Sequence, residues 1–186
     1  MDLGKQNILF FTRTMMLGGT ENVVLQLCEV FKPKVNKIVV CSCGGVNVEK
    51  LTEMGIRHYQ IPDISSKKDM FKICRTVKKI VEKEQITVIH SHHRMAAFYT
   101  EILFGSSIIK IANAHNTFFD KKLLTRFAYR NTKVIAVGKM VKKNLVDYFR
   151  IPEKQVSVIH NAVKPFDGDY ICLLYTSPSP RDGLLS

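Results

Sequence analysis

The feature that most constrains this chain is an unbroken alternation of short apolar runs with longer amphipathic segments. The apolar runs predict strands at residues 7–12, 37–43, 57–62, 86–90, 107–115, 133–138 and 155–163. The segments between them have apolar side chains at helical spacing and predict helices at residues 20–31, 48–55, 65–84, 94–104, 121–130 and 139–149. Apolar strands that are separated by helices are typical of a parallel sheet that is buried on both sides. We therefore expect an α/β fold with a doubly wound parallel sheet.

Length and composition fit one such domain. The chain has 186 residues, of which 46% are hydrophobic and 24% charged, as in packed globular domains and unlike disordered chains. An excess of 28 Lys and Arg over 16 Asp and Glu gives a net charge of +12. This charge favours anionic partners such as nucleic acid, phosphate groups or an anionic membrane surface.

The cysteines and the apolar runs indicate where such a protein works. The five cysteines have neither a redox nor a zinc-binding spacing, which favours a reduced, intracellular environment. No apolar run approaches the roughly 18 residues that a membrane-spanning helix needs. Residues 7–12 are too few for the apolar part of a secretion signal. We expect a cytoplasmic protein.

The first strand is followed by the loop "MLGGTE", which contains Gly18 and Gly19. Ligands of doubly wound sheets bind at the carboxyl ends of the strands, where helix N-termini present N–H groups to anions. A pair of glycines allows the backbone to approach such a ligand closely. The alternative is an ordinary flexible turn, because the loop is neither GxGxxG nor a P-loop.

Histidines gather after two of the predicted strands. His90, His92 and His93 occur in "VIHSHHRMAA", and three close imidazoles suggest a metal site. Against metal, Arg94 adds a fixed positive charge and no Asp or Glu follows within a few residues. We favour polar contacts in the ligand crevice.

The run "IANAHNTFF" places His115 at the end of another strand, with Asn113 and Asn116 on either side of it. A single histidine at a strand end is often only a hydrogen-bonded polar residue. Its place on the rim of the same crevice makes a functional role for His115 an equal alternative.

At this point the chain resembles a known family. The segments "GGTENVVLQL", "VIHSHHRMAA", "ANAHNTF", "VIAVGKMVKKNLVDYF" and "VSVIHNAV" occur in the order and spacing found in the N-terminal half of retaining GT-B glycosyltransferases. These belong to the glycogen-synthase-like superfamily, whose bacterial members build capsule, exopolysaccharide and lipopolysaccharide. The resemblance covers residues 5 to 163 and implies a Rossmann-like sheet that forms one half of a GT-B fold.

The resemblance also implies roles for individual residues. In the family, an N-terminal domain that mostly holds the acceptor faces a C-terminal domain that binds the nucleotide-sugar, and no metal or other cofactor takes part. By resemblance, His115 lies beside the transferred sugar as the catalytic residue. Gly18 and Gly19 lie near the donor phosphates, and the substrate-binding residues are His92, His93 and Asn116.

The end of the chain departs from the family pattern. We expect residues 1–169 to form the N-terminal domain, with a linker at 164–169, and residues 170–186 to be a non-native, disordered tail. The run "CLLYTSPSPRD" is similar to the translation of an adapter used in preparing sequencing libraries. The alternative is a natural tail rich in Ser and Pro. The first interpretation describes a truncated, inactive fragment that lacks the nucleotide-sugar domain.

Basic residues lie close to aromatic ones between residues 118 and 130. This arrangement suits an anionic membrane surface, and many family members glycosylate lipid-linked acceptors there. The candidate contacts are Lys121, Lys122, Arg126 and Arg130. The lysine-rich helix at 65–84 is as well explained by a solvated helix face. We therefore expect a cytoplasmic protein that associates with the inner face of the cell membrane.

Two other functions compete with glycosyl transfer. A nucleotide-sugar 2-epimerase on the same scaffold would carry acidic residues in the cleft, and no Asp or Glu lies at the expected strand ends. A basic nucleic-acid-binding module would need stacking aromatics on a sheet face or a recognition helix. The strands, expected to be buried on both sides, argue against the second alternative.

Overall fold

The computed structural model describes residues 2–162 and contains one seven-stranded parallel sheet with the strand order β3-β2-β1-β4-β5-β6-β7. The strands are β1 (Asn7–Phe11), β2 (Lys37–Ser42), β3 (Arg57–Gln60), β4 (Val88–Ser91), β5 (Ile109–Ala114), β6 (Lys133–Ala136) and β7 (Val156–Val158). The expected doubly wound parallel sheet is confirmed. The order reverses between β1 and β4, which makes this the switch point where ligands of such folds bind.

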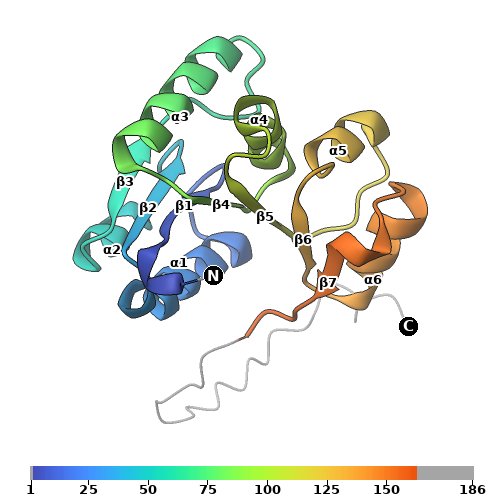
Figure 1. The fold of residues 1–186 in the computed structure, drawn as a ribbon, viewed down its shortest axis with the longest axis horizontal. Coiled ribbons are helices and arrows are strands. Elements are labelled where there is room, and N and C mark those ends of the chain that lie inside the picture. The colour runs from blue at the N-terminus through green and yellow to red at the C-terminus, as the bar shows by residue number, and fades with distance from the viewer. Residues whose placement is uncertain (1, 163–186) are drawn as a thin grey trace, which may run out of the picture.

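Helices cover the sheet unequally. The helices are α1 (Gly19–Phe31), α2 (Val48–Glu53), α3 (Met70–Glu84), α4 (Arg94–Phe104), α5 (Lys122–Ala128) and α6 (Lys139–Lys143). Short helical turns are η1 (Leu3–Lys5), η2 (Lys32–Lys34), the π-helical η3 (Asn144–Tyr148), which continues α6, and η4 (Glu153–Gln155). Figure 1 shows α3, α4 and α5 above the sheet and α1 and α2 below it. This division follows from right-handed crossovers that run outward from β1 in both directions.

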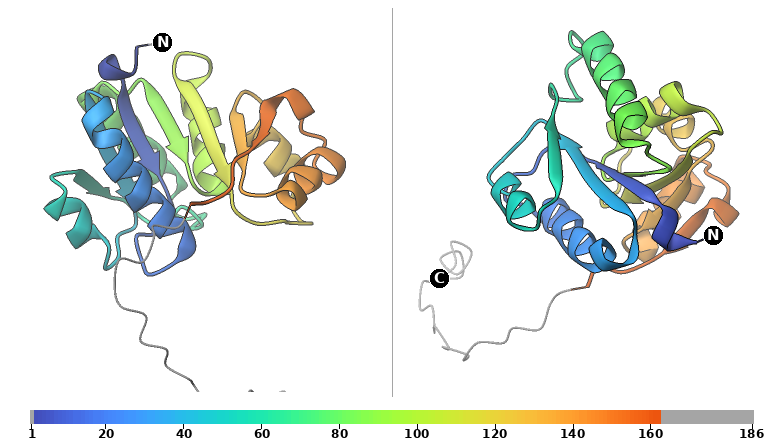
Figure 2. Two further views of the ribbon diagram at one scale, coloured as in Figure 1. Left: turned by 90° about the horizontal axis from the view of Figure 1, so that it is seen from below. Right: turned by 60° about the vertical axis from the view of Figure 1, so that its left-hand side comes forward.

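The expectation that all strands are buried on both sides is wrong for the half of the sheet that lies beyond β4. The face under α3 to α6 is packed, whereas the face that carries α1 and α2 has no further helix over β5 to β7 in the described part of the chain (Figure 2, left). Ile109 is 42% exposed and Ile159 56% exposed on this half. An apolar groove of about 430 Å³ opens there, lined in part by Ile111 and Ile135.

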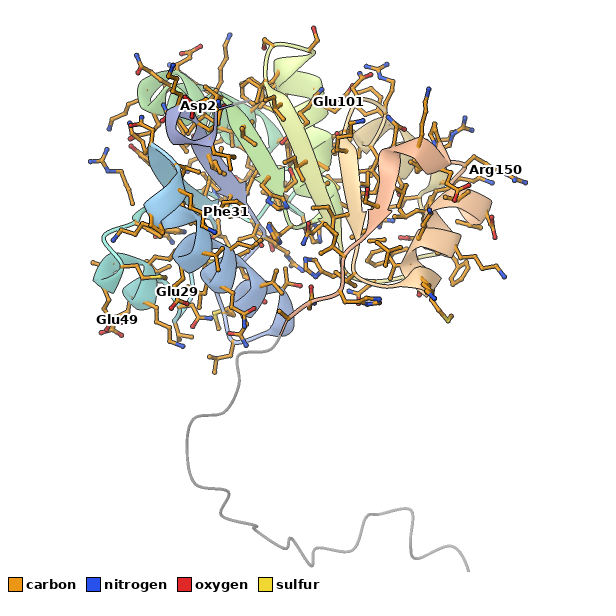
Figure 3. The ribbon with its side chains drawn as sticks, turned by 60° about the horizontal axis from the view of Figure 1, so that its bottom comes forward. Asp2, Glu29, Phe31, Glu49, Glu101 and Arg150 are labelled. Atoms are coloured by element: carbon orange, nitrogen blue, oxygen red, sulfur yellow. The ribbon has the colours of Figure 1, made fainter. Side chains whose placement is uncertain are left out.

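Two buried glutamates hold the amino-terminal edge of the sheet together. Glu101, labelled in Figure 3, accepts hydrogen bonds from Lys110, Arg130 and Asn131, with a Lys110 Nζ to Glu101 Oε2 distance of 2.5 Å. Burial alone would raise its pKa, but these hydrogen bonds outweigh burial and lower it. Glu84 is held in the same way by three partners: Tyr59, Lys37 and Arg57. These networks anchor α3 and α4 at the edge opposite the strand ends that carry the histidines.

A contact between two loops positions the start of α1. The Met15 amide donates to the Gly44 carbonyl at 2.9 Å, and the Asn47 amide donates to the Met15 carbonyl at 2.8 Å. Gly45 has a φ of +144°, and a Cβ at this position would lie 2.4 Å from the backbone of Met15. Only glycine allows this approach, so the loop after β2 fixes the loop that leads from β1 into α1.

Candidate functional site

The carboxyl edge of the sheet holds a pocket of about 210 Å³ at the switch point. Its walls come from the ends of β1, β4 and β5 and from the first turn of α1. The lining residues are Thr12, Arg13, Thr14, Thr20, Glu21, His92, His93, Arg94, Asn113, Ala114, His115, Asn116, Phe118 and Tyr129. Of the residues predicted from the sequence, His92, His93, His115 and Asn116 therefore meet in one pocket.

Three histidine rings pack in a row at the pocket, in which His92 and His115 line the pocket and His90 lies behind His92. The rings of His90 and His92 have centroids 4.5 Å apart, and those of His92 and His115 lie 5.6 Å apart. His92 Nδ1 and His115 Nε2 share a hydrogen bond of 3.3 Å, while His90 Nε2 bonds the Oδ1 of Asn113 at 2.9 Å. The buried ring of Phe10 packs against both His90 and His92. The row is thus held in place before any ligand arrives.

Burial keeps these imidazoles neutral. Desolvation lowers the pKa of His90 to about 4 and that of His92 far below its ordinary value, and the neighbouring histidines lower both further. The pKa of His115 is also lowered by burial, although the charge of Glu21 opposes this effect. Within residues 2–162, His92 Nε2 is buried without a hydrogen-bond partner. A buried nitrogen of this kind is free to bond a ligand that enters the pocket.

His93 and Arg94 are tied to the protein itself. His93 Nδ1 accepts a hydrogen bond from the Met95 amide at 3.1 Å and thereby caps the N-terminus of α4. Arg94 binds Asp120 through both terminal nitrogens, with a shortest distance of 2.8 Å, and lies over the ring of Phe118. The positive charge that the sequence places beside the histidines is therefore balanced by a carboxylate.

A second arginine of the pocket is paired in the same way. Arg13 donates three hydrogen bonds to Asp63, the shortest of 2.8 Å. This contact lowers the pKa of Asp63 to about 2. Among residues 2–162, no group of three His, Cys, Asp or Glu side chains is arranged to hold a metal ion.

The two glycines of the first loop have different surroundings. Gly18 is the N-cap of α1 and Gly19 is its first residue, rather than both lying in the preceding loop. A Cβ at Gly18 would lie 2.4 Å from Glu21 Oε2, whereas a Cβ at Gly19 would meet nothing within 4 Å. Open space for a ligand is therefore beside Gly19, and the space beside Gly18 is filled by a carboxylate.

Glu21 is the acidic residue among several pocket residues, such as Thr14 and Arg13, that the sequence did not reveal. Its Oε1 accepts a hydrogen bond of 2.5 Å from the hydroxyl of Thr14. Acidic groups of the cleft were expected at strand ends, whereas Glu21 enters the pocket from the first turn of a helix. Its spacing of two residues after the glycine pair could have marked it, because a helix that starts at the glycines points its first turn at the ligand.

Solved structures with the same fold belong to more than one kind of enzyme. A glycosyltransferase from Rickettsia africae aligns with 85% of this chain and 44% of its own, at a TM-score of 0.72 and 16% identity. HepE from Anabaena, solved in complex with UDP, aligns with 85% of this chain and 44% of its own, at a TM-score of 0.67 and 16% identity. A UDP-GlcNAc 2-epimerase from Methanocaldococcus jannaschii aligns with 81% of this chain and 45% of its own, at a TM-score of 0.57 and 14% identity. At these identities the likeness shows the fold.

The sequence comparisons are more specific than the fold. A human phosphatidylinositol N-acetylglucosaminyltransferase subunit is 26% identical in an alignment 170 residues long, which covers 81% of this chain. The chain spans 35% of the length of that relative. Residues 17–165 match Glycosyltransferase Family 4. With the pocket at the switch point of a GT-B-type sheet and most of its length matched, the chain belongs to Glycosyltransferase Family 4 and corresponds to the N-terminal domain of a GT-B glycosyltransferase.

Proposed function

We propose that this domain takes part in moving a hexose from a nucleotide-sugar to a glycan or lipid-linked acceptor, with retention of configuration, in the synthesis of a cell-surface polysaccharide. The observation that carries the proposal is the neutral pair of His92 and His115 at the switch-point pocket. Family membership supports the reaction class. The nucleotide is supported by HepE, a structural neighbour that binds UDP.

A sugar presents uncharged hydroxyl groups, so the residues beside the transferred sugar must bind it by hydrogen bonds rather than by opposite charge. A neutral imidazole can donate from one nitrogen and accept at the other, so His115, braced by His92, can bond a sugar hydroxyl. Because the hydrogen bond between the two rings fixes His115, such a bond can strengthen in the transition state without reorganisation. His93 and Asn116 provide further polar contacts on the same rim. We assign the reaction no metal or other cofactor.

The approach of the donor phosphates is proposed at Gly19. The backbone there is open, and the N-terminus of α1 carries the partial positive charge that favours anions. This chain aligns with only 44% of the length of each of these two structural neighbours, so we propose that donor binding also requires residues beyond it. The 186-residue chain alone should then show no turnover at the rate of about 1 per second or more that is typical of enzymes.

The test is an assay of nucleoside diphosphate release from UDP- and GDP-sugars. It compares the 186-residue chain with a protein that joins residues 1–162 to a C-terminal half recovered from its own gene. The longer protein should turn over in the presence of acceptor and of a metal chelator, and NMR of the product should show retained anomeric configuration. Loss of activity on chelation, or inversion, would contradict the mechanism.

A 2-epimerase remains the second candidate because of Glu21. This carboxylate lies in the pocket, and one structural neighbour is a UDP-GlcNAc 2-epimerase. Incubation of the longer protein with UDP-GlcNAc in D₂O, without acceptor, separates the two reactions. An epimerase would exchange the hydrogen at C2 for deuterium, whereas the glycosyltransferase should leave C2 unlabelled.

We also propose that the start of α5 contacts an anionic membrane surface. Phe119 is 73% exposed and Leu123 79% exposed, and the exposed Lys121, Lys122 and Arg126 lie beside them in sequence. The guanidinium of Arg130 is bound by Glu101, so the proposal rests on the other three cations. The described helices include none long and apolar enough to cross a membrane.

Sedimentation with vesicles of phosphatidylcholine, with and without phosphatidylglycerol, tests this contact on the 186-residue chain. Replacing Lys121 and Lys122 by Gln should weaken binding to the anionic vesicles about 30-fold, since each lysine near such a surface contributes roughly 1 kcal/mol. Lys78→Gln with Lys79→Gln on α3 is the matched control. An equal loss in the control would mean that the net charge, and not α5, binds the vesicles.

A further inference from the structure

Glu21 is a half-buried carboxylate on the wall of the pocket, and its hydrogen-bonding capacity is mostly unused. Oε1 accepts the hydroxyl of Thr14 at 2.5 Å, and Oε2 lies against Gly18. Within residues 2–162, no Lys, Arg or His forms an ion pair with it. A carboxylate has about four lone-pair positions, so acceptor sites remain for a ligand.

The other charges of the pocket are already balanced. Arg13 is paired with Asp63 and Arg94 with Asp120, each at 2.8 Å. The carboxylate of Glu21 is thus the pocket charge without an opposite charge beside it in the described part of the chain. Such a group accepts hydrogen bonds from hydroxyl groups, which are what a sugar presents.

A purely structural role does not account for this arrangement. Glutamate at the third position of a helix often accepts the amide of the N-cap residue in a capping box. Here the acceptor bond of Glu21 goes to the side chain of Thr14, on the loop after β1, and not to the amide of Gly18. The carboxylate is therefore held at the pocket by a residue outside its own helix.

We propose that Glu21, held by Thr14, is a sugar-binding residue that accepts hydrogen bonds from hydroxyl groups of the sugar in this pocket, which the imidazole of His115 also lines. The proposal rests on the proposed function and adds a second recognition group to it. A carboxylate and a neutral imidazole that line the same pocket together provide acceptors and a donor for sugar hydroxyls. This sugar belongs either to the acceptor or to the donor, because both substrates carry sugar hydroxyls that can donate to the Glu21 carboxylate.

Steady-state kinetics of the longer protein distinguish the two sources. Glu21→Gln keeps the shape of the side chain but removes its charge, and it should raise the KM of one substrate about tenfold or more, as expected for the loss of a charged hydrogen bond. A rise in the KM of the acceptor assigns Glu21 to the acceptor, and a rise in the KM of the nucleotide-sugar assigns it to the donor. Glu49→Gln, on α2 and exposed, is the matched control and should change neither.

Binding measured on the 186-residue chain makes the proposal independent of turnover. Saturation-transfer NMR with methyl glycosides should detect binding to the parent chain and a dissociation constant about tenfold higher for Glu21→Gln, with unchanged denaturation midpoints. No binding by the parent, or equal constants for parent and variant, would overturn the role of Glu21. Absence of turnover by the longer protein would instead overturn the proposed function, and the binding experiment would still decide this proposal.

Discussion

The two walls of the pocket are built in opposite ways. The wall at the ends of β4 and β5 is buried and bonded to itself: His92 is 2% exposed, and its Nδ1 is taken by His115. The wall at the start of α1, formed by Thr20 and Glu21, lies next to an open segment: Leu17 is 79% exposed, and Gly19 has no neighbour around its missing side chain. We infer that the two walls have different roles. The histidines at the ends of β4 and β5 are preorganised for the reaction, and the start of α1 leaves space for the ligand.

The largest expected effect comes from the buried wall. His115→Ala in the longer protein should lower kcat about 100-fold or more, as does the loss of one preorganised donor in other enzymes. The reason is that a hydrogen bond formed mainly in the transition state lowers the barrier, whereas uniform binding does not. Measuring kcat together with the denaturation midpoint separates catalysis from folding.

His160→Ala is the control for this variant. His160 is exposed, bonds the carbonyl of Val137 and has no role in the proposed reaction. A kcat of His115→Ala within threefold of the parent, with donor binding intact, would show that His115 is only a rim residue.

The second prediction concerns stability against pH. The pKa of His90 is about 4 in the folded protein and about 6.5 when unfolded, so the unfolded chain binds the proton more tightly. The stability from this group is present above pH 6.5 and is lost as the pH falls from about 6.5 to 4. For His90 alone the loss between pH 7 and 5 should be about 2 kcal/mol in the free energy of unfolding.

Denaturant titrations of the 186-residue chain at pH 7 and 5 measure this loss. His90→Gln cannot titrate but can still bond Asn113, so its stability should depend less on pH than that of the parent. Asp63 and Glu84, whose pKa values are about 2, contribute only at lower pH. If the free energy of unfolding depends on pH in the same way in parent and variant, His90 is not desolvated as described.

The smallest expected effect is a difference in stability between alanine variants of the two glycines at the start of α1. Gly19→Ala has room for its Cβ and should raise the free energy of unfolding by about 0.5 kcal/mol, since alanine favours a helix. Gly18→Ala places a Cβ against Glu21 and loses a favourable N-cap, so it should be destabilising by about 1 kcal/mol. Denaturation midpoints of the 186-residue chain test both.

The same pair of variants sharpens the donor proposal. If the donor phosphates approach Gly19, Gly19→Ala should raise the donor KM in the longer protein although it stabilises the fold. A donor KM equal to that of the parent would mean that the phosphates bind elsewhere and that the space beside Gly19 holds the sugar instead.

Local patterns predicted most of the fold. The helix expected at residues 94–104 is α4 with the same bounds, and each predicted strand exists, because apolar spacing reports directly on burial. The ends of the elements were predicted less well than their existence. The strand expected at 155–163 is only Val156–Val158, because its partner β6 ends at Ala136, the residue that pairs with Val158. The expected tail at 170–186 lies outside the described residues.

The sequence by itself determined the parallel α/β sheet, the order of its elements and the presence of His92, His93, His115 and Asn116 at strand ends. It could do so because strand and helix periods are local, and because the carboxyl ends of parallel strands share one edge. Only the tertiary structure decided that His92 bonds His115 across 23 residues of sequence, that each arginine of the pocket has its own carboxylate, and that half of one sheet face is open. The entry of Glu21 into the pocket belongs with these, because contacts between distant segments depend on how helices and loops pack in three dimensions and leave no period in the sequence.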